Sequence, residues 1–414
     1  KDLGATYQPA ETLFKLWAPI SKQVVLYLDG IPYPMEKTNH GVWERTVSGD
    51  WDGKVYYYLH RMNGQWIEVH DPYALSSLAN SGHSIVINPA KLHKPERAKH
   101  QIPMEQAIIY EMSVRDFSWQ KEAGFQHSGQ YKGLTESPIL DKQVLGLDYV
   151  KNLGVTHIQL MPLYDFGSVD EQHPELIYNW GYDPVQYNVP EGSFSSNPND
   201  PYARILELQA AIQAYHDADI SVIMDVVYNH TYNLDSPLQK TVPYYYYREW
   251  EDGTISNGSD CGNETASERE MFRRFMVHSV CYWAKEYHID GFRFDLMALH
   301  DTETMNAIRT ALNRMPRGEE ILVYGEPWKA AASAMQEGYF PSDKQNIGKL
   351  MDGISMFCDD TRDSIKGSVF IAAEGGYVNG KERLSAGILS ATDGWLDGKG
   401  AYEPRNASQL IPYV

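Results

Sequence analysis

The stretch "IDGFRFD" (289–295) ends an apolar run with two opposite charges, Arg293 and Asp295. Residues two apart on a β-strand point to the same face, so these two side chains should enter the same space. A charge in a closed interior is costly unless it is paired or used in chemistry. Taken alone, the spacing fits a structural ion pair and a catalytic pair equally well.

Glu326 is a second carboxylate of interest, and it follows the next predicted strand, in "EILVYGEPW" (320–328). Consecutive parallel strands end at the same edge of a sheet, so Asp295 and Glu326 should face each other. Two carboxylates on either side of one bond are the groups that hydrolyse glycosides. In the retaining version one carboxylate attacks the anomeric carbon, and the other donates a proton to the leaving oxygen.

The surroundings of the two carboxylates predict which role each one takes. Arg293 beside Asp295 favours the ionised form that a nucleophile requires. The apolar neighbours of Glu326 in "YGEPW" should raise its pKa, as a general acid requires. The pattern therefore predicts a nucleophile at Asp295 and an acid at Glu326.

The run "DVVYNH" (225–230) carries three more polar candidates. His230 can donate a hydrogen bond to a sugar hydroxyl. Asp225 is predicted to be structural, bonding across the sheet to Arg293, and Asn229 is expected to support the site. A lone imidazole is a poor metal site, so we predict no metal ligands and disfavour a metal-dependent barrel hydrolase.

Six nearly continuous apolar runs indicate strands that are buried on both faces, and helical patterns lie between them. The runs are 107–117, 155–166, 220–230, 289–299, 320–328 and 353–360. Five of them end in polar residues: Arg115 and Asp116; Asp165; Asn229 and His230; Arg293 and Asp295; Glu326. A ring of polar groups at the carboxyl ends of parallel strands is typical of a (β/α)₈ TIM-type barrel. A doubly wound sheet is disfavoured because the sequence has no glycine-rich phosphate loop.

Residues 1–100 have a different pattern, with short alternating strands and turn residues roughly every ten positions, which predicts a β-sandwich. Trp17 is predicted to be core, since it follows Phe14 and Leu16 in a tight apolar run. Residues 89–106 are polar and proline-containing, and they are predicted to be a linker. The chain is therefore predicted to be multidomain, with a sandwich over 1–100 and a barrel over 101–414.

Three motifs, "DVVYNH", "GFRFDLM" and "YGEPW", occur in that order on successive predicted strands. They resemble the first three motif regions of the α-amylase superfamily, glycoside hydrolase family 13. "YNWGYDP" (178–184) resembles the signature of the type I pullulanases, which cut α-1,6 bonds in pullulan and limit dextrins. "FKLWAP" with "DPYA", in the N-terminal unit, is similar to a family 48 carbohydrate-binding module.

The resemblance implies that Asp295 is the nucleophile, that Glu326 is the general acid/base and that Arg293 orients Asp295. It assigns substrate binding to three further residues: Tyr182, which would stack under the sugar, His230, which would bind its hydroxyls, and Trp328, which would shape the site for a branch. It implies no required cofactor. A structural calcium ion near the first motif is compatible with the family, and Asn229 could touch it.

The sequence departs from the family pattern at its C-terminal end. The family has a third carboxylate in a fourth motif, which reads something like HDN, and no HDN occurs here. The final residues, "NASQLIPYV", resemble the approach to that motif. Only six barrel strands are predicted, so we expect a barrel that is incomplete at the C-terminus and a 414-residue chain that is incomplete as an enzyme.

Composition narrows the partners and the location. The net charge of −19 disfavours nucleic acid and anionic membranes, and it suits a neutral substrate such as an α-glucan. No apolar run is long enough to span a bilayer and no signal peptide is recognised, so a cytoplasmic location is expected over a secreted one. Three widely spaced cysteines indicate neither a disulfide framework nor a zinc pattern. The rival interpretations are an isoamylase, a glycogen-debranching or branching enzyme, and a non-catalytic glucan-binding fragment.

Overall fold

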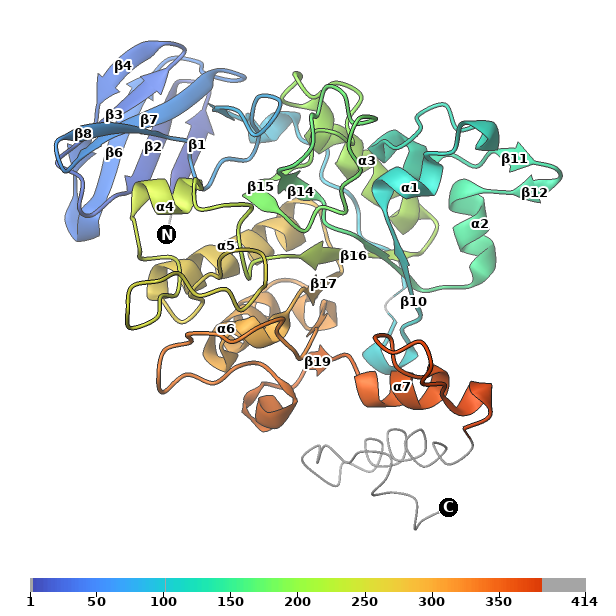
Figure 1. Cartoon of the computed structure of the whole chain (residues 1–414). Helices are drawn as coiled ribbons and strands as arrows, with labels where there is room; N and C mark the ends of the chain where they lie inside the picture. The colour runs from blue at the N-terminus through green and yellow to red at the C-terminus, as the bar shows by residue number, and fades with distance from the viewer. Residues whose placement is uncertain (1–2, 101, 382–414) are drawn as a thin grey trace.

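The computed structural model describes residues 3–100 and 102–381, which form an all-β unit followed by an α/β unit (Figure 1). The first unit packs two antiparallel sheets face to face. One sheet has the strand order β1 (Gly4–Gln8), β2 (Glu11–Trp17), β6 (Val42–Ser48), β5 (Glu36–Lys37). The other has the order β4 (Ile31–Pro34), β3 (Gln23–Leu28), β7 (Val55–Met62), β8 (Gln65–Val69), and β9 (Ser84–Ile85) pairs with β7. The predicted β-sandwich is confirmed.

The core of the sandwich follows from the alternation of its strands. In β2, Phe14 and Leu16 are buried, and they meet Leu26 and Tyr58 of the opposite sheet in one apolar cluster. Trp17 is next to Leu16 and therefore points to the other face. Its ring packs edge-on against Tyr245 and Tyr246 of the second unit, and its indole N–H donates to the carbonyl of His40. The prediction that Trp17 is sandwich core is therefore wrong, because it lies at the junction of the two units.

The second unit is built around a parallel sheet with one strand in each of the six predicted runs. Its order is β10 (Ile109–Met112), β13 (His157–Leu160), β16 (Ser221–Val226), β17 (Gly291–Phe294), β18 (Leu322–Gly325), β19 (Ile354–Met356). Within the described residues β10 and β19 are the two edges of this sheet, so it forms six strands of an eight-stranded barrel. The "NASQLIPYV" run, 406–414, lies outside the described residues.

Helices follow most of the parallel strands, as the apolar periodicity predicts. They are α1 (Val114–Ser118), α2 (Gly146–Leu153), α3 (Ala203–Asp217), α4 (Pro237–Thr241), α5 (Glu270–Glu286), α6 (Thr302–Asn313) and α7 (Asp359–Lys366). Helix α5 buries Phe272, Phe275 and Met276 on the face that its sequence pattern marks as apolar. No helix among residues 3–100 and 102–381 has both the length and the apolarity to cross a bilayer.

Two of the polar strand ends are placed differently from the prediction. Arg115 and Asp116 belong to helix α1 rather than to the end of β10. Asp165 lies in β14 (Tyr164–Phe166), which pairs antiparallel with β15 (Pro184–Pro190) outside the parallel sheet. The run 155–166 is divided because Pro162 has no backbone N–H for a continuing strand. Asp165 is fully buried beside Glu171 and Glu191, so it does not open toward the sheet edge that carries Asp295.

The polar segment 89–106 is packed along helix α3 rather than extended between the units. Backbone N–H groups of His93, Glu96 and His100 donate to side chains at the surface of α3 and just after it. Sandwich strands end at Ile85 and the parallel sheet begins at Ile109, and the boundary at residue 100 stays a prediction. This segment holds the sandwich against the barrel at the start of the chain's second unit.

Candidate active site

Arg293 is the centre of the candidate site, and the register of the sheet places it there. In the parallel register Arg293 lies beside Asp225 of β16 and Tyr324 of β18. Its Nη1 donates to Asp225 Oδ1 at 3.0 Å and to Asp295 Oδ1 at 3.1 Å, and its Nη2 lies 2.7 Å from Glu326 Oε1. One guanidinium therefore contacts three carboxylates at the carboxyl ends of three adjacent strands.

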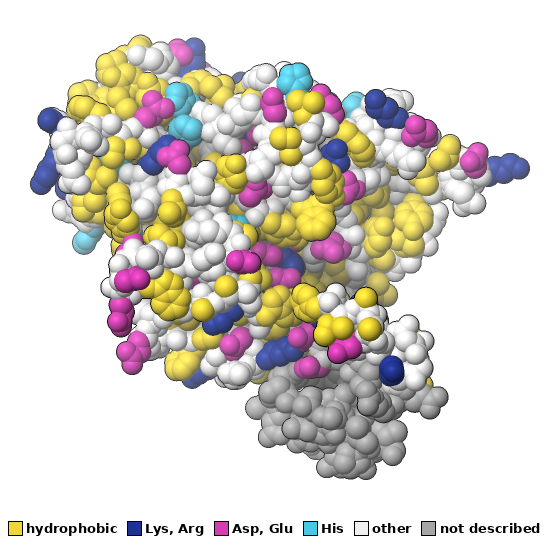
Figure 2. Space-filling model, viewed as in Figure 1, with side chains coloured by type: hydrophobic (Ala, Val, Ile, Leu, Met, Phe, Trp, Pro, Cys, Tyr) yellow, Lys and Arg dark blue, Asp and Glu magenta, His cyan; other side chains and the backbone are white. Residues whose placement is uncertain are grey.

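Asp295 and Glu326 contact the two terminal nitrogens of that guanidinium, Nη1 and Nη2. Because both carboxylates contact one guanidinium, their nearest oxygens lie less than about 9.5 Å apart, which is the upper limit of the separation between catalytic carboxyls in glycosidases. Each carboxylate has a second fixed donor, which limits its rotation. Asn229 Nδ2 donates to Asp295 Oδ2 at 2.8 Å, and the backbone N–H of Leu296 donates to Glu326 Oε2 at 2.9 Å. Figure 2 shows acidic and basic side chains together in a recess near the middle of the molecular face, with hydrophobic side chains around it.

Two of the three carboxyls that Arg293 contacts have a raised pKa. Burial raises the pKa of Glu326, and this effect outweighs the opposing charge of Arg293. Burial and the charge of Asp295 raise the pKa of Asp225 to about 7, against the opposing effect of Arg293. Both carboxyls therefore hold a proton more readily than an exposed acid does.

Tyr182 closes one side of the site, and its position depends on the turn before it. Its hydroxyl donates to Asp225 Oδ2 at 2.8 Å. Gly181 has a φ of +92°, and a Cβ at that position would meet Phe166 and Pro162 at 3.0 Å. Asn179 fixes the same turn, because its Oδ1 accepts from the backbone N–H of Gly181 at 2.8 Å. Asn179 and Gly181 of "YNWGYDP" therefore form the turn that places Tyr182 in the site.

His230 is buried, and both of its ring nitrogens face protein oxygens. Nε2 lies 2.8 Å from the carbonyl oxygen of Tyr182, and Nδ1 lies 2.6 Å from Asn229 Oδ1. Burial lowers the pKa of His230, so its imidazole is neutral near pH 7 and donates one hydrogen bond. The predicted bond from His230 to a sugar hydroxyl would have to replace one of these contacts. In this geometry His230 ties the Tyr182 turn to the end of β16.

Comparison with known proteins agrees with this geometry. A model of carbohydrate-binding module 48 (isoamylase N-terminal domain) matches residues 2–74, and a model of the α-amylase catalytic domain matches residues 128–263. The chain is therefore similar to members of the α-amylase superfamily. A pullulanase from Bacillus subtilis is 37% identical over 410 residues, covering 95% of this chain and 56% of that protein.

Solved structures support the same assignment. A pullulanase from Anoxybacillus sp. LM18-11 in complex with maltotetraose superposes with a TM-score of 0.89 at 42% identity, covering 94% of this chain and 58% of that one. A pullulanase from Paenibacillus barengoltzii in complex with maltohexaose and α-cyclodextrin gives a TM-score of 0.87 at 41% identity, covering 94% and 62%. The chain thus spans a little over half the length of these α-amylase superfamily members.

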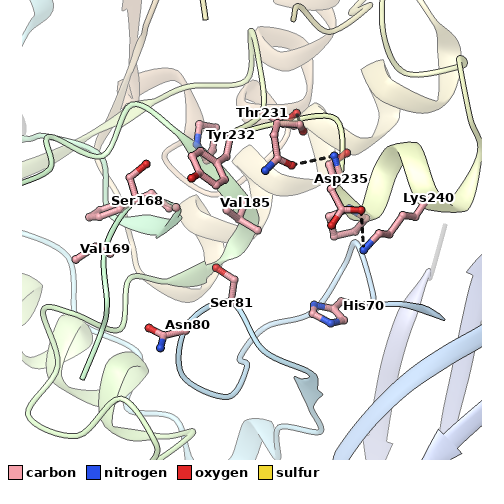
Figure 3. A pocket seen from close by; sticks show the side chains of 16 residues that line it. His70, Asn80, Ser81, Ser168, Val169, Val185, Thr231, Tyr232, Asp235 and Lys240 are labelled. Carbon is pink, nitrogen blue, oxygen red and sulfur yellow. Dashed lines mark hydrogen bonds and ion pairs between the residues drawn. The ribbon is translucent and has the colours of Figure 1, made fainter. Parts of the chain in front are cut away.

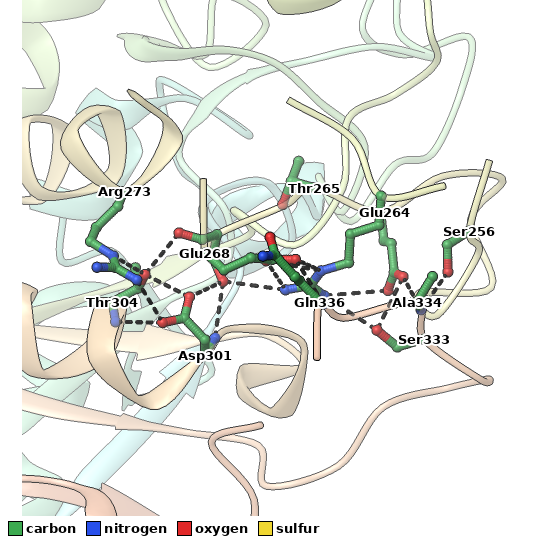
Figure 4. A network of polar contacts seen from close by, with 12 residues as sticks. Ser256, Glu264, Thr265, Glu268, Arg273, Asp301, Thr304, Ser333, Ala334 and Gln336 are labelled. Atoms are coloured by element: carbon green, nitrogen blue, oxygen red, sulfur yellow. Dashed lines mark hydrogen bonds and ion pairs between the residues drawn. The ribbon is translucent and has the colours of Figure 1, made fainter. Parts of the chain in front are cut away.

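The loop after β18 carries Trp328, and a buried polar network anchors this loop. Trp328 is half-buried, and its ring centroid lies 6.5 Å from that of Phe357. Backbone N–H groups of Ala330 and Ala331 donate to the carbonyl of Gly258 at 3.0 and 2.9 Å. Farther along the loop, Ala334 and Gln336 donate to buried glutamates of the segment 256–268 (Figure 4).

Arg248 stabilises those glutamates. Its Nη2 donates to Glu268 at 2.7 Å, and its Nη1 lies 3.7 Å from Glu264, with all three side chains buried. A buried arginine between two carboxylates is tolerated because the charges are paired and hydrogen-bonded. The segment 257–270 therefore supplies part of the frame that positions Trp328.

The structure places further polar and aromatic side chains near the strand ends that were not identified from the sequence. Inside the sheet, Gln159 Nε2 donates to Glu111 at 2.9 Å, and Tyr324 donates to Gln159 Oε1 at 2.6 Å. Near the same strand ends Tyr178 and Trp180 are more than half exposed, and Trp180 Nε1 donates to the Tyr178 hydroxyl at 2.7 Å. A polar residue inside an apolar strand run is the signal that identifies Glu111 and Gln159. Tyr178 and Trp180 lie within "YNWGYDP", but the sequence does not indicate that their side chains are exposed.

The calcium ion that the family resemblance allows near Asn229 stays a prediction. Calcium takes six to eight oxygen ligands, and the Oδ1 of Asn229 is already 2.6 Å from His230. We therefore derive no step of the chemistry through a calcium ion.

Proposed function

We propose that the protein is a debranching glycoside hydrolase that cleaves α-1,6-glucosidic bonds in pullulan, limit dextrins and related α-glucans. The observation that carries the proposal is the placement of Asp295 and Glu326 on one guanidinium, at the ends of adjacent parallel strands. The similarity to pullulanases over more than nine-tenths of the chain supports the choice of substrate. Related pullulanases have been solved in complex with maltotetraose and with maltohexaose, which supports an α-glucan ligand here.

The proposed reaction is a retaining double displacement. In the first step Glu326 donates its proton to the glycosidic oxygen while the Asp295 carboxylate attacks the anomeric carbon. The bond to the leaving sugar breaks, and a glycosyl ester forms on Asp295. In the second step the Glu326 carboxylate takes a proton from water, whose oxygen attacks the anomeric carbon and releases Asp295.

Arg293 is proposed to position both reacting groups. Its contact with Asp295 holds that side chain in place, while its contact with Glu326 opposes protonation of the acid. Burial of Glu326 outweighs that opposition and raises its pKa, so the acid role is supported. The raised pKa of Glu326 favours the protonated form that the first step requires of the acid.

The walls of the site suit a neutral sugar. Tyr182 is proposed to stack under the sugar ring at the cleavage point, since aromatic faces bind the C–H faces of sugars. Trp328 on the anchored loop after β18 is proposed to shape the region that receives the branch. Asp225 and Asn229 are proposed as supports, because their described contacts go to Arg293, Tyr182 and Asp295. We also propose a cytoplasmic location, with which the few and widely spaced cysteines of the sequence are compatible.

A glycogen-debranching activity is the second candidate. A glycogen operon protein from Haemophilus influenzae is 30% identical over 352 residues, covering 75% of this chain and 50% of that protein. The "YNWGYDP" turn favours the pullulanase interpretation, since it resembles the signature of that group. The two activities differ in their products from pullulan.

Incubation of the purified protein with pullulan tests the proposal. A pullulanase releases maltotriose, which chromatography with reducing-end detection identifies. Comparison with glycogen as substrate separates the two debranching activities. Release of sugar from glycogen but none from pullulan would reject the pullulanase proposal in favour of the second candidate, and binding without release would indicate a non-catalytic glucan-binding protein.

A further inference from the structure

A cluster of two histidines and one glutamate lies on the sandwich, apart from the residues proposed for catalysis. Glu68 is in β8 and His70 follows that strand, so the two side chains, two residues apart, point to one face. His83 comes from the segment just before β9. One ligand atom of each side chain lies within 4.8 Å of those of the other two. His83 Nε2 is 2.7 Å from Glu68 Oε1, and the rings of His70 and His83 meet edge to face with centroids 5.2 Å apart.

His70 also faces a cavity of about 320 Å³ between the sandwich and the segment 231–240 of the barrel unit (Figure 3). Neither ring nitrogen of His70 has a hydrogen-bond partner among the described residues, although both are strong polar groups. Lys240 lines the same cavity, and its charge is compensated by Asp235 at 3.0 Å. An imidazole with a free lone pair therefore faces a space that can hold water or a ligand.

The donor set points to a particular class of ligand. Two imidazoles and one carboxylate suit Zn²⁺ and similar divalent transition metals, whereas Mg²⁺ and Ca²⁺ prefer ligands that are all oxygen. Ligand atoms around a tetrahedral zinc ion lie about 3.3–3.5 Å apart for bonds of 2.0–2.2 Å. Small side-chain rotations would bring the three atoms to that spacing, and the exposure of Glu68 leaves room for them.

We propose that Glu68, His70 and His83 bind one divalent transition-metal ion such as Zn²⁺, with a fourth coordination position open to the cavity between sandwich and barrel. Helix α4 packs against β8, so the ion would sit where the two units meet. Because the ion binds the folded arrangement of strands, it should stabilise the folded state. The proposal is independent of the reaction proposed for Asp295 and Glu326.

Equilibrium binding of Zn²⁺ to the purified, chelator-treated protein tests the site. We expect one saturable site per chain, and binding weakened more than about tenfold by Glu68→Gln or by His70→Gln. His173→Gln is the matched control, because His173 is also an exposed histidine beside a glutamate, Glu175 at 3.6 Å, but the described part of the chain offers it no third ligand. The control should bind Zn²⁺ as the unmodified protein does. If Glu68→Gln binds Zn²⁺ as tightly as the unmodified protein, the proposal is overturned. The same holds if His173→Gln loses as much affinity as Glu68→Gln, because the binding is then adventitious and due to surface histidines.

A thermal measurement without activity separates loss of the site from loss of the fold. Glu68→Gln keeps the size of the side chain and an acceptor for His83, so its melting temperature without metal should equal that of the unmodified protein. Saturating Zn²⁺ should raise the melting temperature of the unmodified protein and of His173→Gln by several degrees. It should leave Glu68→Gln unchanged. An absent shift in the unmodified protein, or an equal shift in Glu68→Gln, contradicts the proposal.

Discussion

Arg293 is the residue on which the candidate site depends. It contacts three carboxylates from three adjacent strands, and two of them, Asp295 and Glu326, are proposed to carry out the reaction. A point charge cannot replace the planar fork of a guanidinium at a site with several bonds. Arginine at this position therefore fixes geometry as well as charge.

Replacement of Arg293 by lysine tests that view. Arg293→Lys keeps a positive charge but can hold only part of the three-carboxylate arrangement. We expect kcat on pullulan to fall on the order of 10²–10³, as with loss of one preorganised electrostatic group. Arg274→Lys is the control, because Arg274 is exposed and pairs only with Glu270 on the same helix. Near-normal turnover by Arg293→Lys would show that charge alone is sufficient.

Asp225 gives a prediction of pH dependence. Burial raises its pKa to about 7 in the folded protein, above the value of about 3.9 in an unfolded chain. Its contribution to stability is therefore full below about pH 4, and it is lost as the pH rises through 7. The free energy of unfolding of the unmodified protein, minus that of Asp225→Asn, should decrease between these pH values. Denaturant titrations at pH 4, 5.5 and 7 measure it, and a difference that grows with pH would mean that Arg293 keeps Asp225 ionised.

At the scale of residues, the sequence predicted the carboxylates and their partners but not all of their contacts. Spacing of two on a strand was enough to place Arg293 and Asp295 on one face. The contact from Arg293 to Glu326 depends on side-chain conformations across two strands, which a one-dimensional pattern does not contain. The two protein contacts of His230 were missed for the same reason.

At the scale of elements, the parallel strands were predictable and the short antiparallel pair was not. Strands buried on both faces are continuous apolar runs, and each of the six runs contains one parallel strand. The run 155–166 reads as one strand, but Pro162 ends it, and Asp165 joins a separate two-stranded sheet. Trp17 shows the same limit in the sandwich, because strand alternation places it on the face opposite to Leu16.

A substitution in the turn before Tyr182 tests whether this turn determines the position of Tyr182 in the site. Gly181→Ala should displace Tyr182, because the new Cβ would press on Phe166 and Pro162 and the φ of +92° is unfavourable for alanine. We expect kcat/KM for pullulan to fall at least about tenfold, since misplacement of a substrate-positioning group is costly. Steady-state kinetics measure this effect.

Gly253→Ala is the matched control for that turn. Gly253 also has a positive φ, +82°, but no atom lies within 4 Å of the position its Cβ would take. It should therefore show the backbone strain alone, with kcat/KM close to that of the unmodified protein. An equal loss in both variants would mean that general destabilisation, rather than the position of Tyr182, reduces activity.

At the scale of the whole molecule, the sandwich and the barrel unit are joined by specific contacts. Trp17 packs on Tyr245 and Tyr246, and the segment 89–106 packs along α3. The composition and strand rhythm predicted two units, but they could not predict these contacts, which involve residues more than 100 positions apart. The junction therefore belongs to the tertiary structure and not to a local pattern.

Removal of the Trp17 ring tests the strength of this junction. Trp17→Ala deletes a half-buried aromatic side chain, and we expect the protein to lose about 2 kcal/mol of stability. Trp66→Ala is the control, because Trp66 is about half exposed and surface changes usually stay within about 0.5 kcal/mol. Urea titrations followed by tyrosine and tryptophan fluorescence measure both. Equal stability of the two variants would show that the Trp17 contacts contribute little.

The central claim is that Asp295 attacks the sugar and Glu326 supplies and then removes the proton. Trapping of the covalent intermediate tests it most directly, with Glu326→Gln and an α-glucosyl fluoride, whose leaving group needs no acid. The variant lacks the base for the second step, so the glycosyl ester should accumulate. Mass spectrometry of peptides should then find one glycosyl group on Asp295. A glycosyl group on another carboxylate, or turnover to the inverted sugar without any labelled peptide, would contradict the account.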